Sequence, residues 1–325
     1  MNFFPETIIV TGPTATGKTA LAVELARRFN GEIVSVDSRQ VFRYMDIGSG
    51  KDLSEYGEIP YHLIDVADPG EPYDLFRYLP DACTAIKDIA ARGKLPVLCG
   101  GTTMYLDALL RGYSLNGAKP DLKLREELDK LSLPELNARL DALAPPDLET
   151  FTDRSNPLRV RRAIENTLAT GRARCFASEG GLLGNALVMG VYFPRKTVHE
   201  RVEKRLDARL QEGMIDEIRD LHEVHNVSYQ VLERYGLEYR YVSEYLQGKI
   251  DYTTMRNTLL YNIRKFVKRQ DIWFRKMERE GVDIHWIVNG DLQEAVLLTG
   301  KFLQHEPLPP TPVKLSETFY GNRSE

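Results

Sequence analysis

The sequence lacks the features that mark secreted and membrane proteins. Its 325 residues include only three cysteines, and Cys83, Cys99 and Cys175 form neither an even disulfide framework nor a pair at metal-ligand spacing. No apolar run approaches the roughly 20 residues of a membrane helix. The first residues hold no basic segment followed by an apolar stretch and a cleavage site, so we expect no signal peptide. These absences predict a cytoplasmic protein with reduced thiols and no membrane partner.

An excess of positive charge is also missing. The chain has 43 Lys and Arg residues against 47 Asp and Glu residues, a formal net charge of -4. The overall charge therefore does not indicate a nucleic-acid partner, and such a partner must be argued from local clusters. Zinc-ligand spacings and internal repeats are absent too. With 42% hydrophobic and 28% charged residues, the composition is that of an ordinary globular protein, and the length suggests about two domains.

The strongest motif is a glycine-rich loop near the N-terminus, formed by Gly12, Pro13, Thr14, Ala15, Thr16, Gly17, Lys18 and Thr19. It follows an apolar run at 7–10 and opens into a helical pattern at 20–26, which is the context of a phosphate-binding loop. The loop N–H groups, the helix N-terminus and Lys18 would bind a diphosphate, and the Thr19 hydroxyl is placed to hold Mg²⁺. The loop alone does not tell a nucleotide from an isoprenoid diphosphate.

Further strands complete an α/β protein whose parallel sheet is flanked by helices; they are predicted at 32–38, 61–66, 95–99, 187–193 and near 283–288. Because the carboxyl ends of parallel strands line the ligand crevice, we expect Asp37 and Thr102 beside the phosphate-binding loop. Capping of the following segment is the alternative role of each. Asp65 is expected to be structural, because Pro69 and Gly70 make a turn after it.

Changes in composition predict the domain organisation. Residues 1–113 form the first part of the core. Residues 114–185 alternate prolines with polar helical segments and hold no convincing strand, which predicts a helical insertion. Residues 186–304 return to the core. The tail at 305–325, with its proline cluster, is expected to be disordered.

Two regions are locally basic. Arginines gather with a single acid, Glu165, in a cluster made of Arg154, Arg159, Arg161, Arg162, Arg172 and Arg174. In a long helix expected at 253–279, lysines and arginines alternate with aromatic side chains, which are Tyr261, Phe266, Trp273 and Phe274. Such regions suit the binding of an unpaired RNA loop, because its phosphates pair with the Lys and Arg side chains and its nucleobases stack on the aromatic rings. A solvated face is the alternative for the charges, and burial is the alternative for the aromatics, which we expect for Phe266 and Trp273.

Together, these motifs resemble those of the tRNA dimethylallyltransferases, also called tRNA isopentenyltransferases. The matching residues lie within 12–19, 35–42, 45–48, 62–65, 100–102, 156–165 and 268–275. The C-terminal zinc finger of eukaryotic relatives is absent, which favours a bacterial-type enzyme. The resemblance implies a P-loop NTPase-like sheet with a tRNA-binding helical insertion. We expect a monomer.

The resemblance implies transfer of a dimethylallyl group from dimethylallyl diphosphate to N6 of adenosine 37, in tRNAs that read codons beginning with U. The products would be N6-dimethylallyladenosine and diphosphate. Asp37 would act as the base toward N6, and Thr102 with Arg201 or Arg205 would act at the diphosphate, with Mg²⁺ as cofactor. The partner would be the tRNA anticodon stem-loop, and its expected contacts are Asp37, Ser38, Arg39, Gln40, Arg125, Leu158, Arg159, Val160, Arg161, Arg162, Tyr239, Arg240, Arg264, Lys268, Arg269, Gln270 and Arg275. One departure is Glu238, which stands where the family commonly has glycine.

Three alternatives share the loop. An adenylate isopentenyltransferase would use free nucleotide, and a small-molecule kinase would use a nucleoside triphosphate. The basic regions weigh toward tRNA, because a small substrate gives them no partner. An RNA-binding protein that lost catalysis is disfavoured by the intact Lys18, Thr19 and Asp37.

Overall fold

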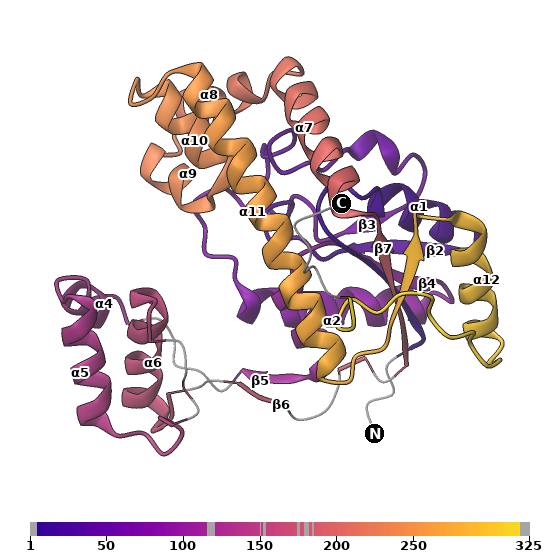
Figure 1. The fold of residues 1–325 in the computed structure, drawn as a ribbon, viewed down its shortest axis with the longest axis horizontal. Coiled ribbons are helices and arrows are strands. Elements are labelled where there is room, and N and C mark those ends of the chain that lie inside the picture. Colours follow the sequence, from indigo (N-terminus) through magenta and orange to yellow (C-terminus); the bar gives the residue numbers. More distant parts are fainter. Residues whose placement is uncertain are drawn as a thin grey trace. The chain divides into compact units, whose positions relative to one another are not determined.

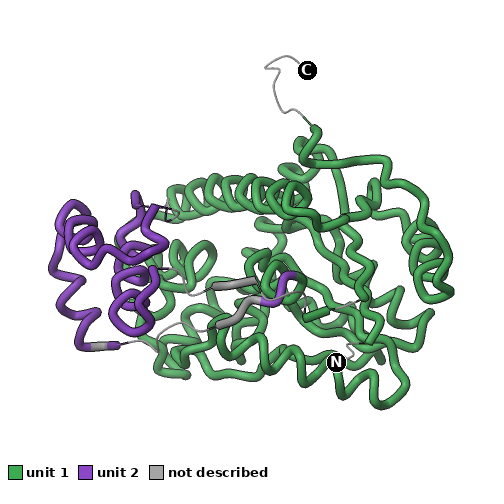
Figure 2. The backbone as a smooth tube through the Cα atoms, turned by 90° about the horizontal axis from the view of Figure 1, so that it is seen from below, with its two compact units in different colours: residues 1–110, 182–325 green, residues 111–181 purple. Residues whose placement is uncertain are grey.

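The computed structural model describes residues 5–318, except 116–120, 150, 152–153, 174–175, 179–181 and 184. Two compact units make up the chain: residues 1–110 together with 182–325, and residues 111–181 (Figure 2). The second unit corresponds to the insertion expected at 114–185, and its boundaries differ from that range by a few residues. Arg174 and Cys175 lie outside the described residues.

A six-stranded parallel sheet forms the centre of the first unit, with its strands in the order β3, β2, β4, β1, β7, β8. The strands are β1 Thr7–Thr11, β2 Gly31–Ser35, β3 Tyr61–His62, β4 Leu95–Cys99, β7 Ala186–Tyr192 and β8 Ile284–Val288. Every residue of β1 and β4 is buried, as expected for inner strands of a sheet that is covered on both faces. The predicted parallel α/β sheet is confirmed, although β3 is shorter than the run at 61–66.

Helices pack on this sheet (Figure 1). α1 (Lys18–Arg28) and α12 (Leu292–Leu303) share one hydrophobic core with alternate strand residues such as Ile8, Val10 and Ile33. α2 (Leu75–Ala91) packs against β2 and β4, and its Tyr78 stacks on Tyr105 of α3 (Thr103–Arg111). Helix α12 was not predicted. Its N-cap, Asp291, accepts hydrogen bonds from two backbone N–H groups of the first turn, and such a cap is a signal that could have identified it.

A second group of helices in this unit precedes β8. It comprises α7 Arg195–Gln211, α8 Met214–Glu223, α9 Tyr229–Tyr235, α10 Leu237–Leu246 and α11 Tyr252–Arg279. α11 packs on α7 and α10 and runs from this group towards β8 (Figure 1). Its buried stripe recurs every three or four residues through Ile263, Val267, Gln270 and Phe274, so it includes one amide. Of the aromatics on α11, Phe274 is fully buried, whereas Phe266 and Trp273 are half-buried, so their expected burial is only partial.

The described residues of the second unit form the helices α4 Leu122–Leu128, α5 Leu133–Leu143 and α6 Pro157–Thr170. They share a core that includes Leu128, Leu136, Leu140 and Val160. Two short strands flank these helices in the sequence, β5 Tyr113–Leu115 before α4 and β6 Phe176–Ser178 after α6, and they pair with each other in antiparallel orientation. The expectation of no strand within 114–185 is therefore wrong. Each strand has only three residues, too few to show an alternating pattern.

The segment 305–318 is ordered, so the expected disorder is wrong for these residues. Leu315 is 1% exposed. The backbone N–H groups of Leu315 and Ser316 donate to the Glu278 carboxylate, and the backbone N–H of Trp286 donates to the Thr311 hydroxyl over 3.1 Å. The segment is held by partners on α11 and β8 that its own composition does not reveal. None of the described helices is long and apolar enough to cross a membrane.

Candidate active site

The phosphate-binding loop connects β1 to α1 at the carboxyl edge of the sheet. Gly12 and Gly17 have φ angles of 141° and 82°, a conformation that favours glycine. A Cβ atom on Gly12 would also lie 2.8 Å from the backbone oxygen of Val191 in β7. α1 begins at Lys18 without a side-chain cap, so the N–H groups of its first turn are available to an anion.

Charged side chains gather around this loop. Lys18 donates to the backbone oxygen of Pro13 over 2.8 Å, and Arg201 donates to that of Ala15 over 2.8 Å. Arg205 donates to the Thr14 hydroxyl. Burial lowers the pKa of Lys18 to about 8, and burial together with the neighbouring Arg209 charge lowers the pKa of Arg205 to about 10. Such desolvated cations interact strongly with an anion, because solvent screens them little.

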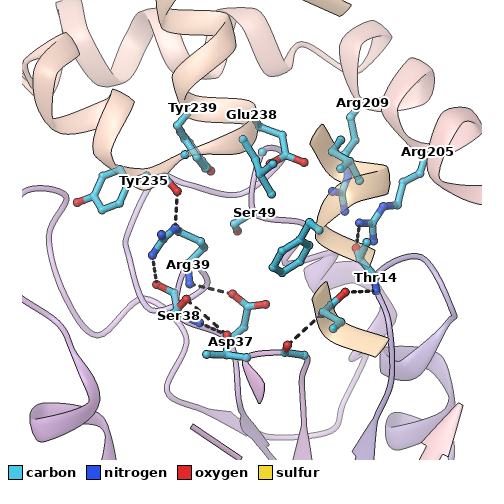
Figure 3. Close-up of a pocket in the computed structure, with 18 of the residues that line it drawn as sticks. Thr14, Asp37, Ser38, Arg39, Ser49, Arg205, Arg209, Tyr235, Glu238 and Tyr239 are labelled. Atoms are coloured by element: carbon cyan, nitrogen blue, oxygen red, sulfur yellow. Dashed lines mark hydrogen bonds between the residues drawn. The ribbon is translucent and has the colours of Figure 1, made fainter. Parts of the chain in front are cut away.

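A cavity of about 170 Å³ opens where the loop meets the ends of β2 and β4 (Figure 3). It brings together Asp37, Thr102, Lys18 and Arg205, which lie far apart in the sequence. The other lining residues are Thr14, Ser38, Arg39, Gly48, Ser49, Gly101, Arg209, Tyr235, Gly236, Leu237, Glu238, Tyr239, Ile263, Phe266 and Gln270. The structure thus brings the residues expected at the strand ends to the phosphate-binding loop.

One oxygen of the Asp37 carboxylate is committed to the backbone. Its Oδ1 accepts from the N–H groups of Arg39 and Gln40 over 2.8 and 3.4 Å, while Oδ2 accepts no hydrogen bond from the described residues. The segment that follows is a turn and not a helix. The Thr102 hydroxyl accepts from the Ser38 N–H over 3.0 Å, which fixes the ends of β2 and β4 to each other. Capping and a chemical role are therefore compatible for Asp37.

A second cavity, of about 420 Å³, lies on the helix side of the loop. It is lined by Ala15, Gly17, Lys18, Thr19, Asp52, Glu55, Arg201, Lys204 and Arg205. Lys18 and Arg205 line both cavities. A diphosphate held by these two cations would therefore be in reach of the Asp37 cavity.

Glu238 adds an acid to the first cavity, from the first turn of α10 (Figure 3). Burial raises the pKa of its carboxyl, against the opposing effect of Arg209 and Arg205. Ser49 and Tyr235 line the same cavity and were not predicted as site residues. The Met45 to Gly48 match to the family pattern ends one residue before Ser49 and could have indicated it.

The predicted tRNA contacts on α10 and α11 occupy different environments. Lys268 and Arg269 are exposed, and among the described residues they pair with no acid. Arg264 instead pairs with Glu203 of α7 over 2.7 Å. The remaining members are committed elsewhere: Arg240 pairs with Glu244, Arg275 donates to the backbone oxygen of Thr318, Tyr239 is buried, and Gln270 is buried.

The predicted tRNA contacts in the second unit also differ in exposure and in ion pairing. Leu158 and Arg159 are exposed near the start of α6, whereas Val160 belongs to the core. Arg125 and Arg162 both donate to the Glu165 carboxylate. Acids from the neighbouring segments pair with two more arginines of the cluster, as Asp129 with Arg161 and Asp141 with Arg154. The sequence pattern therefore overstated the unpaired charge of this cluster.

A parallel sheet that carries a glycine-rich loop beside a carboxylate-lined cavity defines an α/β phosphate-binding protein with a P-loop-like fold. The chain belongs to the IPP transferase family, whose model matches residues 40–277. The isopentenyl transferase model matches residues 5–58, which contain the loop. The resemblance inferred from the motifs is thereby confirmed.

The similar proteins of known name are tRNA dimethylallyltransferases. The chain is 48% identical over 281 residues to tRNA dimethylallyltransferase 2 of Syntrophotalea carbinolica, covering 86% of this chain and 93% of the relative. It is 45% identical to tRNA dimethylallyltransferase 1 of Hahella chejuensis, covering 87% and 92%. Among solved structures, the tRNA isopentenylpyrophosphate transferase of Bacillus halodurans has a TM-score of 0.68 at 29% identity, covering 92% of this chain and 97% of that one. A eukaryotic dimethylallyltransferase has a TM-score of 0.76 at 23% identity, covering 93% and 80%, and supports the fold alone.

Proposed function

We propose that this protein transfers the dimethylallyl group of dimethylallyl diphosphate to N6 of adenosine 37, in tRNAs that read codons beginning with U. The products are N6-dimethylallyladenosine and diphosphate. The observation that carries the proposal is that Lys18 and Arg205 line both the helix-side cavity and the cavity of Asp37. The names of the relatives support the substrates.

The helix-side cavity suits the diphosphate of the donor. Negative charge builds on the leaving oxygen as the allylic C–O bond breaks, and Lys18, Arg201, Arg205 and the loop N–H groups stabilise it. Thr102 lines the Asp37 cavity together with Lys18 and Arg205, the two cations that also line the helix-side cavity. Together these groups bind the donor and lower the barrier to departure of diphosphate.

Mg²⁺ fits the same cavity. Among its described residues, the structure has no group of three His, Cys, Asp or Glu side chains that could coordinate a metal ion. Mg²⁺ does not need such a group, because it is usually bound by one or two protein oxygens, water and substrate phosphates. Thr19, which lines the cavity, would hold the ion. When bound, Mg²⁺ neutralises part of the diphosphate charge.

Asp37 suits the acceptor. The aromatic amine is a weak nucleophile, so a base must take its proton as the new bond forms. N6 forms a bond to the allylic carbon, the C–O bond breaks with its electron pair leaving on diphosphate, and the N6 proton passes to Oδ2 of Asp37. Oδ1 keeps the carboxylate in place through its two backbone bonds.

The adenosine must leave the anticodon stack to enter this cavity, at a cost of a few kcal/mol. Phosphate contacts can offset this cost. The candidates for them are the exposed cationic side chains of Lys268 and Arg269 on α11 and of Arg159 on α6. Because one chain lines both cavities, the reaction needs no second copy, which supports a monomer. The tRNA substrate implies work in the cytoplasm.

An assay with three acceptors tests the proposal. The protein is incubated with labelled dimethylallyl diphosphate, Mg²⁺ and either an unmodified anticodon stem-loop, AMP or ATP. We expect label in the stem-loop alone. Label in AMP or ATP would favour an adenylate isopentenyltransferase. Conversion of ATP to ADP when a small-molecule phosphoryl acceptor is added, with no prenylation of the stem-loop, would favour a kinase.

A further inference from the structure

Gln270 is a neutral group at the centre of the site. It belongs to the buried stripe of α11 and is 4% exposed. Its Oε1 accepts from the Thr14 N–H of the phosphate-binding loop over 3.0 Å, and its Nε2 donates to the Gly101 backbone oxygen over 3.0 Å. One side chain therefore joins the loop after β1 to the turn after β4.

The close fit at the turn supports this geometry. A Cβ atom on Gly101 would lie 2.8 Å from Nε2 of Gln270, so the amide lies directly against the backbone of the turn. The next residue, Thr102, accepts from the Ser38 N–H beside Asp37. Gln270 thus connects the diphosphate end of the site to the segment that carries the base.

The other groups that hold the loop differ from Gln270 in charge. Lys18, Arg201 and Arg205 are cations whose present partners on the loop are neutral oxygen atoms. An anionic diphosphate is a stronger partner for each of them. Gln270 has no charge to offer a phosphate, and each of its polar atoms is already bonded to backbone. Its two bonds can persist while the cations bind the donor.

The neighbours of Gln270 on α11 separate it from RNA. Lys268 and Arg269 are exposed, whereas Gln270 points inward and lines the cavity. An RNA contact by Gln270 would require it to give up its two backbone bonds, which would leave the part-buried Thr14 N–H and Gly101 C=O without these partners. The tRNA contact expected from its position in the sequence is therefore the less favourable role.

We infer that Gln270 is a positioning residue, which holds the phosphate-binding loop and the Gly101 turn at the separation that donor binding and transfer require. The inference rests on the proposed function for the identity of the donor. Without the amide, the Thr14 N–H loses its partner and the loop relaxes. Diphosphate binding then weakens, and the donor carbon is less well aligned with Asp37.

Two substitutions test this role, Gln270→Leu and Gln270→Met, which remove the amide and keep most of the volume. Asn262→Leu is the matched control, because Asn262 is a half-buried amide on the same helix whose one bond to the described residues goes to the Thr258 oxygen of that helix. Binding of inorganic diphosphate with Mg²⁺ is measured by calorimetry, and binding of a labelled anticodon stem-loop by fluorescence anisotropy. Single-turnover transfer and the midpoint of thermal unfolding are measured alongside.

Both Gln270 variants should bind diphosphate about tenfold more weakly, because the part-buried Thr14 N–H loses its partner and the loop is no longer held in place. Their transfer rate should fall, while stem-loop affinity and the behaviour of Asn262→Leu stay at the wild-type level. Unchanged diphosphate binding, loss of stem-loop affinity instead, or a loss seen with Leu but not with Met would each overturn the inference. Failure of the wild type to prenylate RNA would refute the proposed function only, because diphosphate binding remains a separate readout.

Discussion

Donor binding should weaken at alkaline pH, because Lys18 must carry its proton to bind a diphosphate. Burial lowers the pKa of Lys18 to about 8, more than Cys99 and Asp37 raise it. Below that pKa the ammonium is charged and its contribution to affinity is fully present; above it the contribution is lost. The charged fraction falls from about 90% at pH 7 to about 10% at pH 9. The Kd of the donor should therefore rise about tenfold over this range, with a slope of about one log unit per pH unit above pH 8.

Other groups do not account for such a change. The pKa of Cys99 is raised to about 12 by burial and that of Arg205 lies at about 10, so both keep their charge state up to pH 9. A phosphate ester loses its last proton near about pH 6, so the charge of the donor is also constant. Calorimetry between pH 7 and 9 measures the effect, with Lys18→Arg as the control that stays charged. A flat profile for the wild type, or an equal slope in Lys18→Arg, would refute this role of Lys18.

Three further outcomes are expected. Asp37→Asn, which keeps an acceptor oxygen for the turn, should lower the single-turnover rate about 10²- to 10⁴-fold with little change in either Kd; a near wild-type rate would leave Asp37 as a turn cap only. Replacing Lys268 and Arg269 with Ala should reduce the slope of log K against log salt for stem-loop binding by about 1.5, since each phosphate contact contributes about 0.7 to 0.9; an unchanged slope would exclude these contacts. Glu278→Ala should lower the free energy of unfolding in urea by about 1–3 kcal/mol, because Trp286 Nε1 donates to Glu278 over 2.6 Å and is left without an acceptor; an unchanged midpoint would contradict that.

Local patterns in the sequence predicted the parts of the site that local chemistry determines. The glycines of the loop, Lys18 and the strand that precedes Asp37 each have a signature within about ten residues. Partners from other helices could not be predicted in this way. Glu203 lies on α7, yet it pairs with Arg264 on α11, and only the packing of the two helices reveals that pair.

Some signals were present but were interpreted differently. The apolar stripe through Ile263, Val267 and Phe274 places Gln270 on the buried face of α11, although its place in the matching stretch 268–275 led to a prediction of RNA contact. The contacts of 305–318 include the burial of Leu315, the backbone bonds to Glu278 and the bond between Trp286 and Thr311. A proline-rich composition cannot reveal such contacts, because they depend on a helix that lies earlier in the chain.

The central claim is that a diphosphate at Lys18 and an adenosine at Asp37 react within one chain. Its most direct test uses two anticodon stem-loops that differ only at position 37, one with adenosine and one with guanosine, each incubated with labelled dimethylallyl diphosphate and Mg²⁺. Nucleosides are separated after complete digestion of the RNA. We expect label in the adenosine stem-loop alone, recovered as N6-dimethylallyladenosine. Label on another nucleotide, or equal transfer to the guanosine stem-loop, would contradict it.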